Sequence, residues 1–157
     1  MNAVDSKDRP QIIALPPFLF LACAVLGTAL HFFSPSPLTD RFSVKWVGVV
    51  LALIAIVQAY FARRAMIAVG TNIRPDLPTL AIARTGPYRY TRNPMYLSLS
   101  ALQVSLAFIL NDLSPLVFAI PLVLLLHYGV ILREERYLEE KFGNTYLEYK
   151  REVKRWL

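Results

Sequence analysis

The second half of the sequence contains two polar clusters whose residue types could bind a ligand. Gly86-Pro87-Tyr88 leads into Arg92-Asn93-Pro94-Met95-Tyr96. Asn93 followed by Pro94 is typical of a helix start, with Asn as the N-cap and Pro in the first helical position. The unpaired N–H groups at such a helix start form an anion site. The second cluster, Arg133-Glu134-Glu135-Arg136, places two carboxylates between two arginines.

Each cluster also has an interpretation that involves no ligand. The run Arg133 to Arg136 fits a solvated helix end, the tyrosines fit an interfacial aromatic belt, and Asn93-Pro94 fits a simple helix cap. His31 and His127 have no cysteine or carboxylate near them in the sequence, so no metal site is predicted. The sequence shows no Ser-His-Asp arrangement, phosphate loop or dinucleotide fingerprint. The residue types alone therefore predict a polar site without identifying its ligand.

Four long stretches without charged residues must position these clusters. They cover residues 10–39, 46–62, 93–111 and 113–132, and a membrane-crossing helix needs about 17–25 mostly apolar residues. The chain is 55% hydrophobic and 18% charged, which excludes a disordered chain, and its single cysteine excludes a disulfide scaffold. We predict an all-α integral membrane protein with four transmembrane helices, in one domain over residues 1–157. The expected spans are 11–33, 44–62, 94–111 and 115–133, followed by cytoplasmic or interfacial helices over 134–156.

Lysine and arginine are unevenly distributed between the ends of these spans. All of the 17 except Arg41 and Lys45 lie in the N-terminal segment with Lys7 and Arg9, in the 63–92 loop, or in the tail. The positive-inside rule then places both termini in the cytoplasm and the protein in the inner membrane. We assign the net charge of +6 to contact with anionic lipid headgroups rather than nucleic acid.

The last two spans are expected to form a tight antiparallel hairpin. Residues 111–115 offer only a turn, with Ser114 as the predicted N-cap of the fourth span. If the turn is centred near residues 113–114, residues 92–96 lie level with residues 131–135. Both polar clusters should therefore meet at the cytoplasmic rim.

The tail has apolar residues at helical spacing, and Gly143-Asn144 is expected to divide it into two helices. The apolar residues are Leu138, Phe142, Tyr146, Tyr149, Val153 and Trp156. Such an amphipathic segment either lies on the membrane surface or covers the site as a lid, and the two interpretations are compatible.

Taken in order, these motifs resemble the isoprenylcysteine carboxyl methyltransferase family, which is related to membrane phospholipid methyltransferases. The resemblance rests on residues 86–88, 92–96 and 134–135 and on Phe142-Gly143-x-x-Tyr146-x-x-Tyr149, and residues 70–75 also look like small bacterial members. It implies a helical membrane enzyme with a cytoplasmic-side pocket for S-adenosyl-L-methionine. The cofactor-binding residues that it implies are Leu80, Ala81, Ile82, Ala83, Tyr88, Asn93, Pro94, Met95, Tyr96 and Glu134.

The chemistry of S-adenosyl-L-methionine agrees with these positions. Arg92 and the N–H groups of the helix start suit its carboxylate, and Glu134 suits its ammonium. Glu135 could accept a proton from an amine acceptor. Arg92 and Glu135 are therefore the expected catalytic residues.

Two departures from the family pattern bear on the substrate. The usual histidine after the arginine is Asn93 here, and the substrate-binding arginine of eukaryotic members aligns with Val130, so Arg133 is the nearest candidate for that role. We expect methyl transfer to the carboxylate or amine of a lipid-like or apolar small molecule, which would enter laterally from the bilayer. An NADPH-dependent membrane reductase of the sterol-reductase type and a non-enzymatic membrane subunit stay open as alternatives. So thin a bundle is also compatible with a homodimer.

Overall fold

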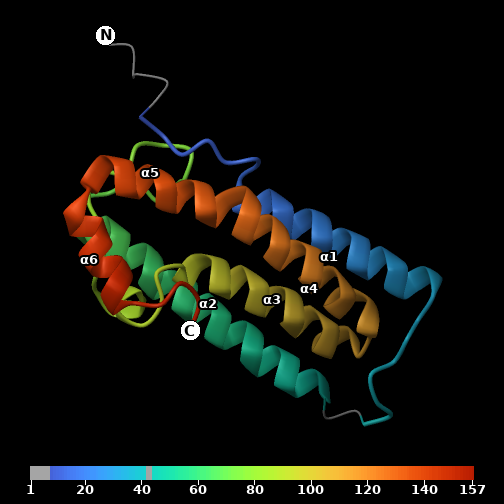
Figure 1. The fold of residues 1–157 in the computed structure, drawn as a ribbon. Helices are drawn as coiled ribbons and strands as arrows, with labels where there is room; N and C mark the ends of the chain where they lie inside the picture. Colours follow the sequence, from blue (N-terminus) through green and yellow to red (C-terminus); the bar gives the residue numbers. More distant parts are fainter. Residues whose placement is uncertain (1–7, 42–43) are drawn as a thin grey trace.

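The computed structural model describes residues 8–41 and 44–157, and these residues are all-helical, as predicted (Figure 1). Lys7, which belongs to the predicted N-terminal positive charge, lies outside the described residues. The helices are α1 (Pro16–Phe33), α2 (Val44–Ala68), the short η1 (Gly86–Arg89), α3 (Pro94–Leu110), α4 (Leu113–Leu126), the π-helical turn η2 (His127–Ile131), α5 (Leu132–Phe142) and α6 (Asn144–Glu152).

Three helices are long and apolar enough to cross a membrane. They are α1, α2 and the continuous helix Leu113–Phe142, which joins α4, η2 and α5. Helix α3 is also apolar but has only 17 residues. The helices therefore indicate a membrane protein, while a fourth crossing stays a prediction.

The two ends of the bundle are built differently (Figure 1). The α1–α2 loop and the α3–α4 turn lie at one end, whereas the long loop between α2 and α3 lies with α5 and α6 at the other. The first described residues approach this second end, where the backbone N–H of Ile13 donates to the carbonyl of Gly129 at 3.1 Å. The polar clusters are thus gathered at one end of the bundle.

Several helix ends differ from the predicted boundaries. The expected fourth span, 115–133, lies within a helix that begins at Leu113 and continues to Phe142. Helix α1 begins at Pro16 rather than near residue 11, because a residue before proline avoids the helical region and Leu15 is extended. Helix α2 continues past residue 62 to Ala68, since no helix-breaking residue occurs before Gly70, which has φ of +72°. The tail divides at Gly143 as predicted, but α6 ends at Glu152 rather than near residue 156.

The predicted hairpin of α3 and α4 is present, but a different residue caps it. Asp112, not Ser114, is the N-cap of α4, and its Oδ1 accepts a hydrogen bond from the backbone N–H of Ser114 at 2.8 Å. Its Oδ2 accepts from the backbone N–H of Ser36 at 2.6 Å. A carboxylate has two acceptor oxygens, so it can cap the helix and hold the α1–α2 loop together, which one hydroxyl cannot do as well.

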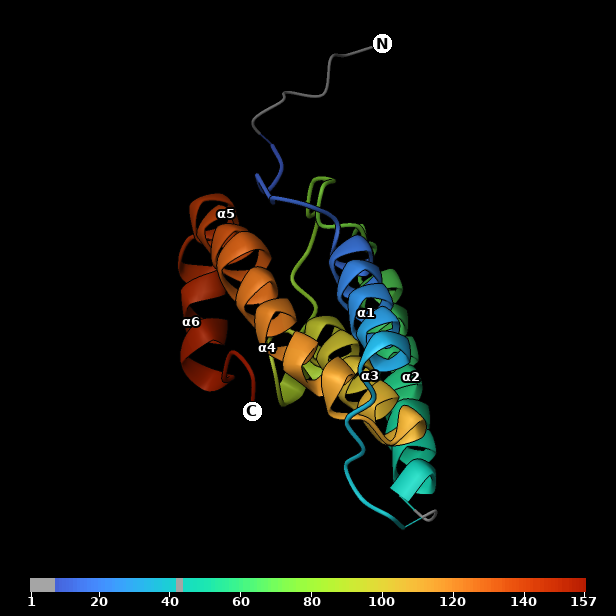
Figure 2. The same ribbon diagram turned by 90° about the vertical axis from the view of Figure 1, so that its right-hand side faces the viewer.

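Glycines allow two pairs of helices to approach closely (Figures 1 and 2). A Cβ atom on Gly48 would lie 2.7 Å from the backbone N of Ile109 and 2.7 Å from the carbonyl O of Ser105, where α2 packs on α3. A Cβ atom on Gly27 would lie 2.8 Å from the Cα of Pro115, where α1 packs on α4. Small residues at such contacts are typical of helix packing in membranes.

We expect Gly48→Val to destabilise the packing of α2 on α3. The added side chain meets backbone atoms, which cannot move aside as a flexible side chain can, and overpacking of this kind costs about 1–3 kcal/mol. Thermal unfolding in detergent should therefore occur at a lower temperature than in the unaltered protein. Val50→Leu, at a position of α2 that is 55% exposed, is the control and should change little. Equal unfolding temperatures for all three proteins would contradict the close contact.

Candidate functional site

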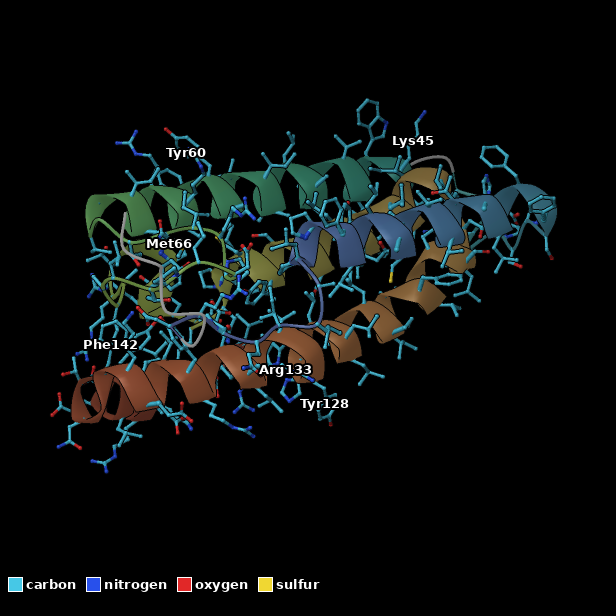
Figure 3. All side chains as sticks on the ribbon, turned by 90° about the horizontal axis from the view of Figure 1, so that it is seen from above. Lys45, Tyr60, Met66, Tyr128, Arg133 and Phe142 are labelled. Atoms are coloured by element: carbon cyan, nitrogen blue, oxygen red, sulfur yellow. The ribbon has the colours of Figure 1, made fainter. Side chains whose placement is uncertain are left out.

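A cavity opens where the loop after α2, the start of α3, α5 and α6 come together. It contains about 750 Å³ free of protein atoms, a volume that includes the open space at its mouth. Figure 3 shows side chains crowded between the end of α2, near Met66, and the end of α5, near Phe142. The cavity is therefore bordered by both polar clusters.

Arg92 and Glu135 form a buried ion pair in the cavity wall. The Nη2 atom of Arg92 lies 3.2 Å from Oε1 of Glu135, and the two side chains are 7% and 6% exposed. Arg155 approaches the same carboxylate, with its Nε 2.9 Å from Oε1 and its Nη2 2.8 Å from Oε2. The Nε and Nη1 atoms of Arg92 are buried and find no hydrogen-bond partner among the residues that the structure describes. The side chain of Arg92 also interacts with the hydroxyl of Tyr146. Because buried donors normally have a partner, the two nitrogens indicate room for a further acceptor.

Glu134 supplies the second carboxylate of the cavity. Its Oε2 accepts a hydrogen bond of 2.7 Å from the hydroxyl of Tyr96, which joins α5 to α3. Within residues 8–41 and 44–157, Glu134 takes part in no ion pair with lysine or arginine. Because Tyr96 meets Glu134 and Arg92 meets Glu135, the predicted alignment of the two polar clusters across the hairpin is confirmed.

Three tyrosines from η1 and α6 complete the polar wall. The hydroxyl of Tyr149 donates to the carbonyl of Tyr88 at 2.8 Å, and the guanidinium of Arg84 lies 5.5 Å from the ring centre of Tyr149. Burial raises the pKa of Tyr88, and the charge of Glu134 raises it further. Burial likewise raises the pKa of Tyr146 and Tyr149. All three hydroxyl groups therefore stay protonated at neutral pH and can donate hydrogen bonds.

Hydrogen bonds from within the loop and from α5 hold the long loop after α2 in place. The hydroxyl of Thr71 accepts from the backbone N–H of Leu80 at 2.9 Å, and the hydroxyl of Tyr137 accepts from the backbone N–H of Thr79 at 3.1 Å. Residues 81–83 consequently line the cavity, whereas Leu80 is 61% exposed.

Asn93 occupies the N-cap position of α3, but its side chain does not cap the helix, contrary to the prediction. Its Nδ2 donates to the carbonyl of Arg155 at 3.0 Å, and its backbone N–H donates to the hydroxyl of Thr91 at 3.2 Å. The carbonyl of Arg155 thus holds the amide of Asn93 on the C-terminal residues and not over the helix end. Pro94 is the first residue of α3, as expected.

Most of the predicted site residues line this one cavity. They are Ala81, Ile82, Ala83, Tyr88, Arg92, Asn93, Met95, Tyr96, Glu134 and Glu135. Leu80, Pro94 and Arg133 do not line it. The Nη1 of Arg133 instead donates to the carbonyl of Gln11 at 2.8 Å on the exposed side of α5. The geometry gives Arg133 no contact with the cavity, and its role toward a substrate stays a prediction.

The cavity also contains residues that were not among the predicted site residues. They are Met66, Thr71, Asn72, Ile73, Arg74, Pro75, Thr79, Leu138, Tyr146 and Tyr149. Residues 71–75 and the two tyrosines lie in the motifs that carry the family resemblance, so the sequence held a signal for them. Leu138 belongs to the apolar face of the tail, for which a lid over the site was one interpretation. Met66 and Thr79 have no such signal, because only the folding of the loop brings them to the cavity.

Comparison with known proteins identifies the family. A family model described as phospholipid methyltransferase matches residues 43–145, which include every predicted site residue. The chain belongs to the phospholipid methyltransferase family. Membership of this family indicates a membrane methyltransferase and does not favour a reductase or a non-enzymatic subunit. The closer resemblance to isoprenylcysteine carboxyl methyltransferases stays a prediction.

A curated relative of this phospholipid methyltransferase family member comes from Haemophilus influenzae (strain ATCC 51907 / DSM 11121 / KW20 / Rd). It is described as an uncharacterized protein and is 40% identical over 63 residues, which are 40% of this chain and 100% of the relative. The description names no activity, so the relative adds nothing about the substrate.

Proposed function

We propose that this protein transfers a methyl group from S-adenosyl-L-methionine to a lipid-like or apolar acceptor at the cytoplasmic face of the inner membrane. In this proposal α3 is the fourth crossing, and the cavity and both termini lie on the cytoplasmic side. Family membership, the three long apolar helices and the concentration of positive charge at the cavity end of the bundle support it.

One observation carries the proposal: the buried Arg92 guanidinium offers two nitrogens that have no acceptor among the described residues. An arginine in this state is suited to a carboxylate, because each of its N–H groups is a charge-assisted donor to an anionic oxygen. On the same cavity wall the carboxylate of Glu134 forms no ion pair with a lysine or arginine of the part of the chain that the structure describes. A ligand with both a carboxylate and an ammonium, such as the amino-acid part of S-adenosyl-L-methionine, satisfies both groups.

The residues present therefore fit the cofactor. Arg92 would hold its carboxylate, Glu134 its ammonium, and Tyr88 or Tyr149 would offer a ring to the adenine or to the sulfonium. The cofactor supplies an activated methyl group, so positioning of the acceptor is the main demand on the protein, and good orientation is worth roughly 7–11 kcal/mol. Tyr146 and Tyr149, both buried on α6, would keep water out of the cavity.

The contacts of Glu135 change the role that the sequence predicts for it. Both of its carboxylate oxygens already accept hydrogen bonds from the guanidinium of Arg155, and Arg92 approaches one of them. Its two oxygens are thus engaged by guanidinium groups and are not turned toward an acceptor in the cavity. We propose that Glu135 orients Arg92 instead of taking a proton from the acceptor.

A wide apolar hollow between α2, the beginning of α3 and the loop before it supports an acceptor that arrives from the bilayer. It is lined by Leu53, Val57 and Phe61 among other residues, and it extends to Pro87 in η1. Ala65 borders this hollow, whereas the next residue, Met66, borders the cavity. An apolar molecule in the hollow would therefore have its polar, methyl-accepting group near the cavity, at the end of α2.

Calorimetry of the full chain in detergent tests this function. S-Adenosylhomocysteine should bind with micromolar affinity, and NADPH should not bind. Incubation of membranes with methyl-labelled S-adenosyl-L-methionine, followed by mass spectrometry of the lipids and apolar metabolites, should then reveal the acceptor. Binding of NADPH alone, or no binding of S-adenosylhomocysteine at millimolar concentration, would overturn the proposal.

A further inference from the structure

The last residues of the chain return from α6 to the beginning of α3 (Figure 1). We call residues 153–157 the C-terminal strap. The backbone N–H of Arg92 donates to the carbonyl of Lys154 at 2.9 Å. The carbonyl of Arg155 accepts from the hydroxyl of Thr91 at 3.1 Å and from Nδ2 of Asn93 at 3.0 Å. The strap is thus bonded to three consecutive residues in front of α3.

The residue after Arg155 fixes the strap on a second helix. Nε1 of Trp156 lies 3.4 Å from Nδ1 of His127 in η2, and the two rings are stacked, with an interplanar angle of 21° and centres 6.3 Å apart. Trp156 also packs against the buried apolar cluster that contains Tyr96 and Leu126. The residues on both sides of Arg155 are therefore held in place, Lys154 by Arg92 and Trp156 by His127, and this fixes the position of the Arg155 backbone.

The side chain of Arg155 leads directly to the cavity wall. Its guanidinium binds both oxygens of Glu135, with distances of 2.9 and 2.8 Å. A two-point contact of this kind fixes the rotation of the carboxylate plane. Of the Arg92 nitrogens, Glu135 contacts Nη2, and the other two have no hydrogen-bond partner within residues 8–41 and 44–157.

We propose that Arg155 is a positioning residue: by fixing Glu135, it holds Arg92 in the orientation that binds the carboxylate of the cofactor. This inference rests on the proposed function. Arg155 itself does not line the cavity, so it acts only through Glu135. Its loss should therefore affect the amino-acid part of the ligand and not the adenosine part. A merely structural role of the strap would affect both parts alike.

Two ligands that differ in one part test this distinction. S-Adenosylhomocysteine carries the amino-acid carboxylate and ammonium, whereas methylthioadenosine has the same adenosine and sulfur without them. For Arg155→Ala in the full chain, calorimetry should show S-adenosylhomocysteine binding weakened about tenfold or more, and methylthioadenosine binding changed less than twofold. Combining Arg155→Ala with Glu135→Gln should weaken S-adenosylhomocysteine binding less than the product of the two single effects, because both act on Arg92.

Arg151→Ala, at an exposed position of α6, is the control and should leave both affinities unchanged. If Arg155→Ala does not fold, Arg155→Lys takes its place, since an ammonium can still contact one oxygen of Glu135 and should weaken only S-adenosylhomocysteine, by a few-fold. Equal losses for both ligands, or no loss for either, would overturn the positioning role while leaving the proposed function intact. If the unaltered protein binds neither ligand, the proposed function fails and this inference fails with it.

Discussion

Arg92→Ala is expected to weaken S-adenosylhomocysteine binding by about 100-fold or more, the largest effect of any single substitution in the cavity. Hydrogen bonds to charged groups are worth about 1.5–3 kcal/mol each, and two buried nitrogens of Arg92 are free to make them. A tenfold change corresponds to about 1.4 kcal/mol, so the loss of both bonds gives the expected factor. Calorimetry on the detergent-solubilised variant provides the measurement.

Arg89→Ala is the matched control for this prediction. Arg89 lies in η1, three positions before Arg92, and its side chain is exposed and outside the cavity lining. Its removal lowers the net charge by the same amount and should leave binding within twofold. Arg92→Lys should fall between the two, because an ammonium keeps the charge but loses the planar fork. An Arg92→Ala variant that binds as tightly as the Arg89→Ala variant would exclude Arg92 from the site.

Glu134→Gln should weaken S-adenosylhomocysteine binding by about tenfold or more and should reduce methyl transfer in parallel. The amide is nearly the same size and can still accept the hydrogen bond of Tyr96, so the variant removes the charge and keeps the packing. What is lost is the attraction to the ammonium of the ligand, a charge-assisted contact in a buried place. Methylthioadenosine, which has no ammonium, should bind as before.

Two further variants, Tyr96→Phe and Glu140→Gln, show whether weaker binding in Glu134→Gln comes from the lost charge at this position. Tyr96→Phe removes the hydroxyl that holds Oε2 of Glu134 but leaves the carboxylate, so a smaller loss of a few-fold is expected. Glu140, exposed on α5, carries the same charge away from the cavity, and its replacement should have no effect. If Glu134→Gln affects both ligands equally, Glu134 supports the fold rather than the ammonium.

The meeting of the two polar clusters could be predicted because a short hairpin leaves little freedom. Two antiparallel helices with the same rise per residue and a turn of fixed length must align residue by residue. The short turn at residues 111–115 therefore sufficed to place Arg92 level with Glu135, which it contacts. It placed Tyr96 level with Ile131, and the hydroxyl of Tyr96 instead reaches Glu134, less than one turn further along the helix. The depth of a residue in such a hairpin can therefore be predicted from its distance along the sequence from the turn.

The C-terminal strap could not be predicted in this way. Val153 and Trp156 extend the helical spacing of the tail, but α6 ends at Glu152 and Val153 is extended. The strap is instead held by contacts with residues 91–93, which are distant in the sequence. Nothing in the composition of the basic tail distinguishes Arg155 from Lys154 or Arg151. The prediction that the side chain of Asn93 caps α3 was wrong for the same reason. Its amide donates to the carbonyl of Arg155, a residue distant in the sequence.

The π-helical turn η2 divides the last long helix into two segments that are out of phase. An α-helix turns by about 100° per residue, and a π-helical turn accommodates one additional residue. Helix α5 is consequently rotated by roughly that angle from the direction that an uninterrupted α4 would give it. The same continuous helix can thereby expose Ile120 and Leu124 on the surface, where lipid would surround them. It still places Glu134 and Glu135 in the lining of the cavity.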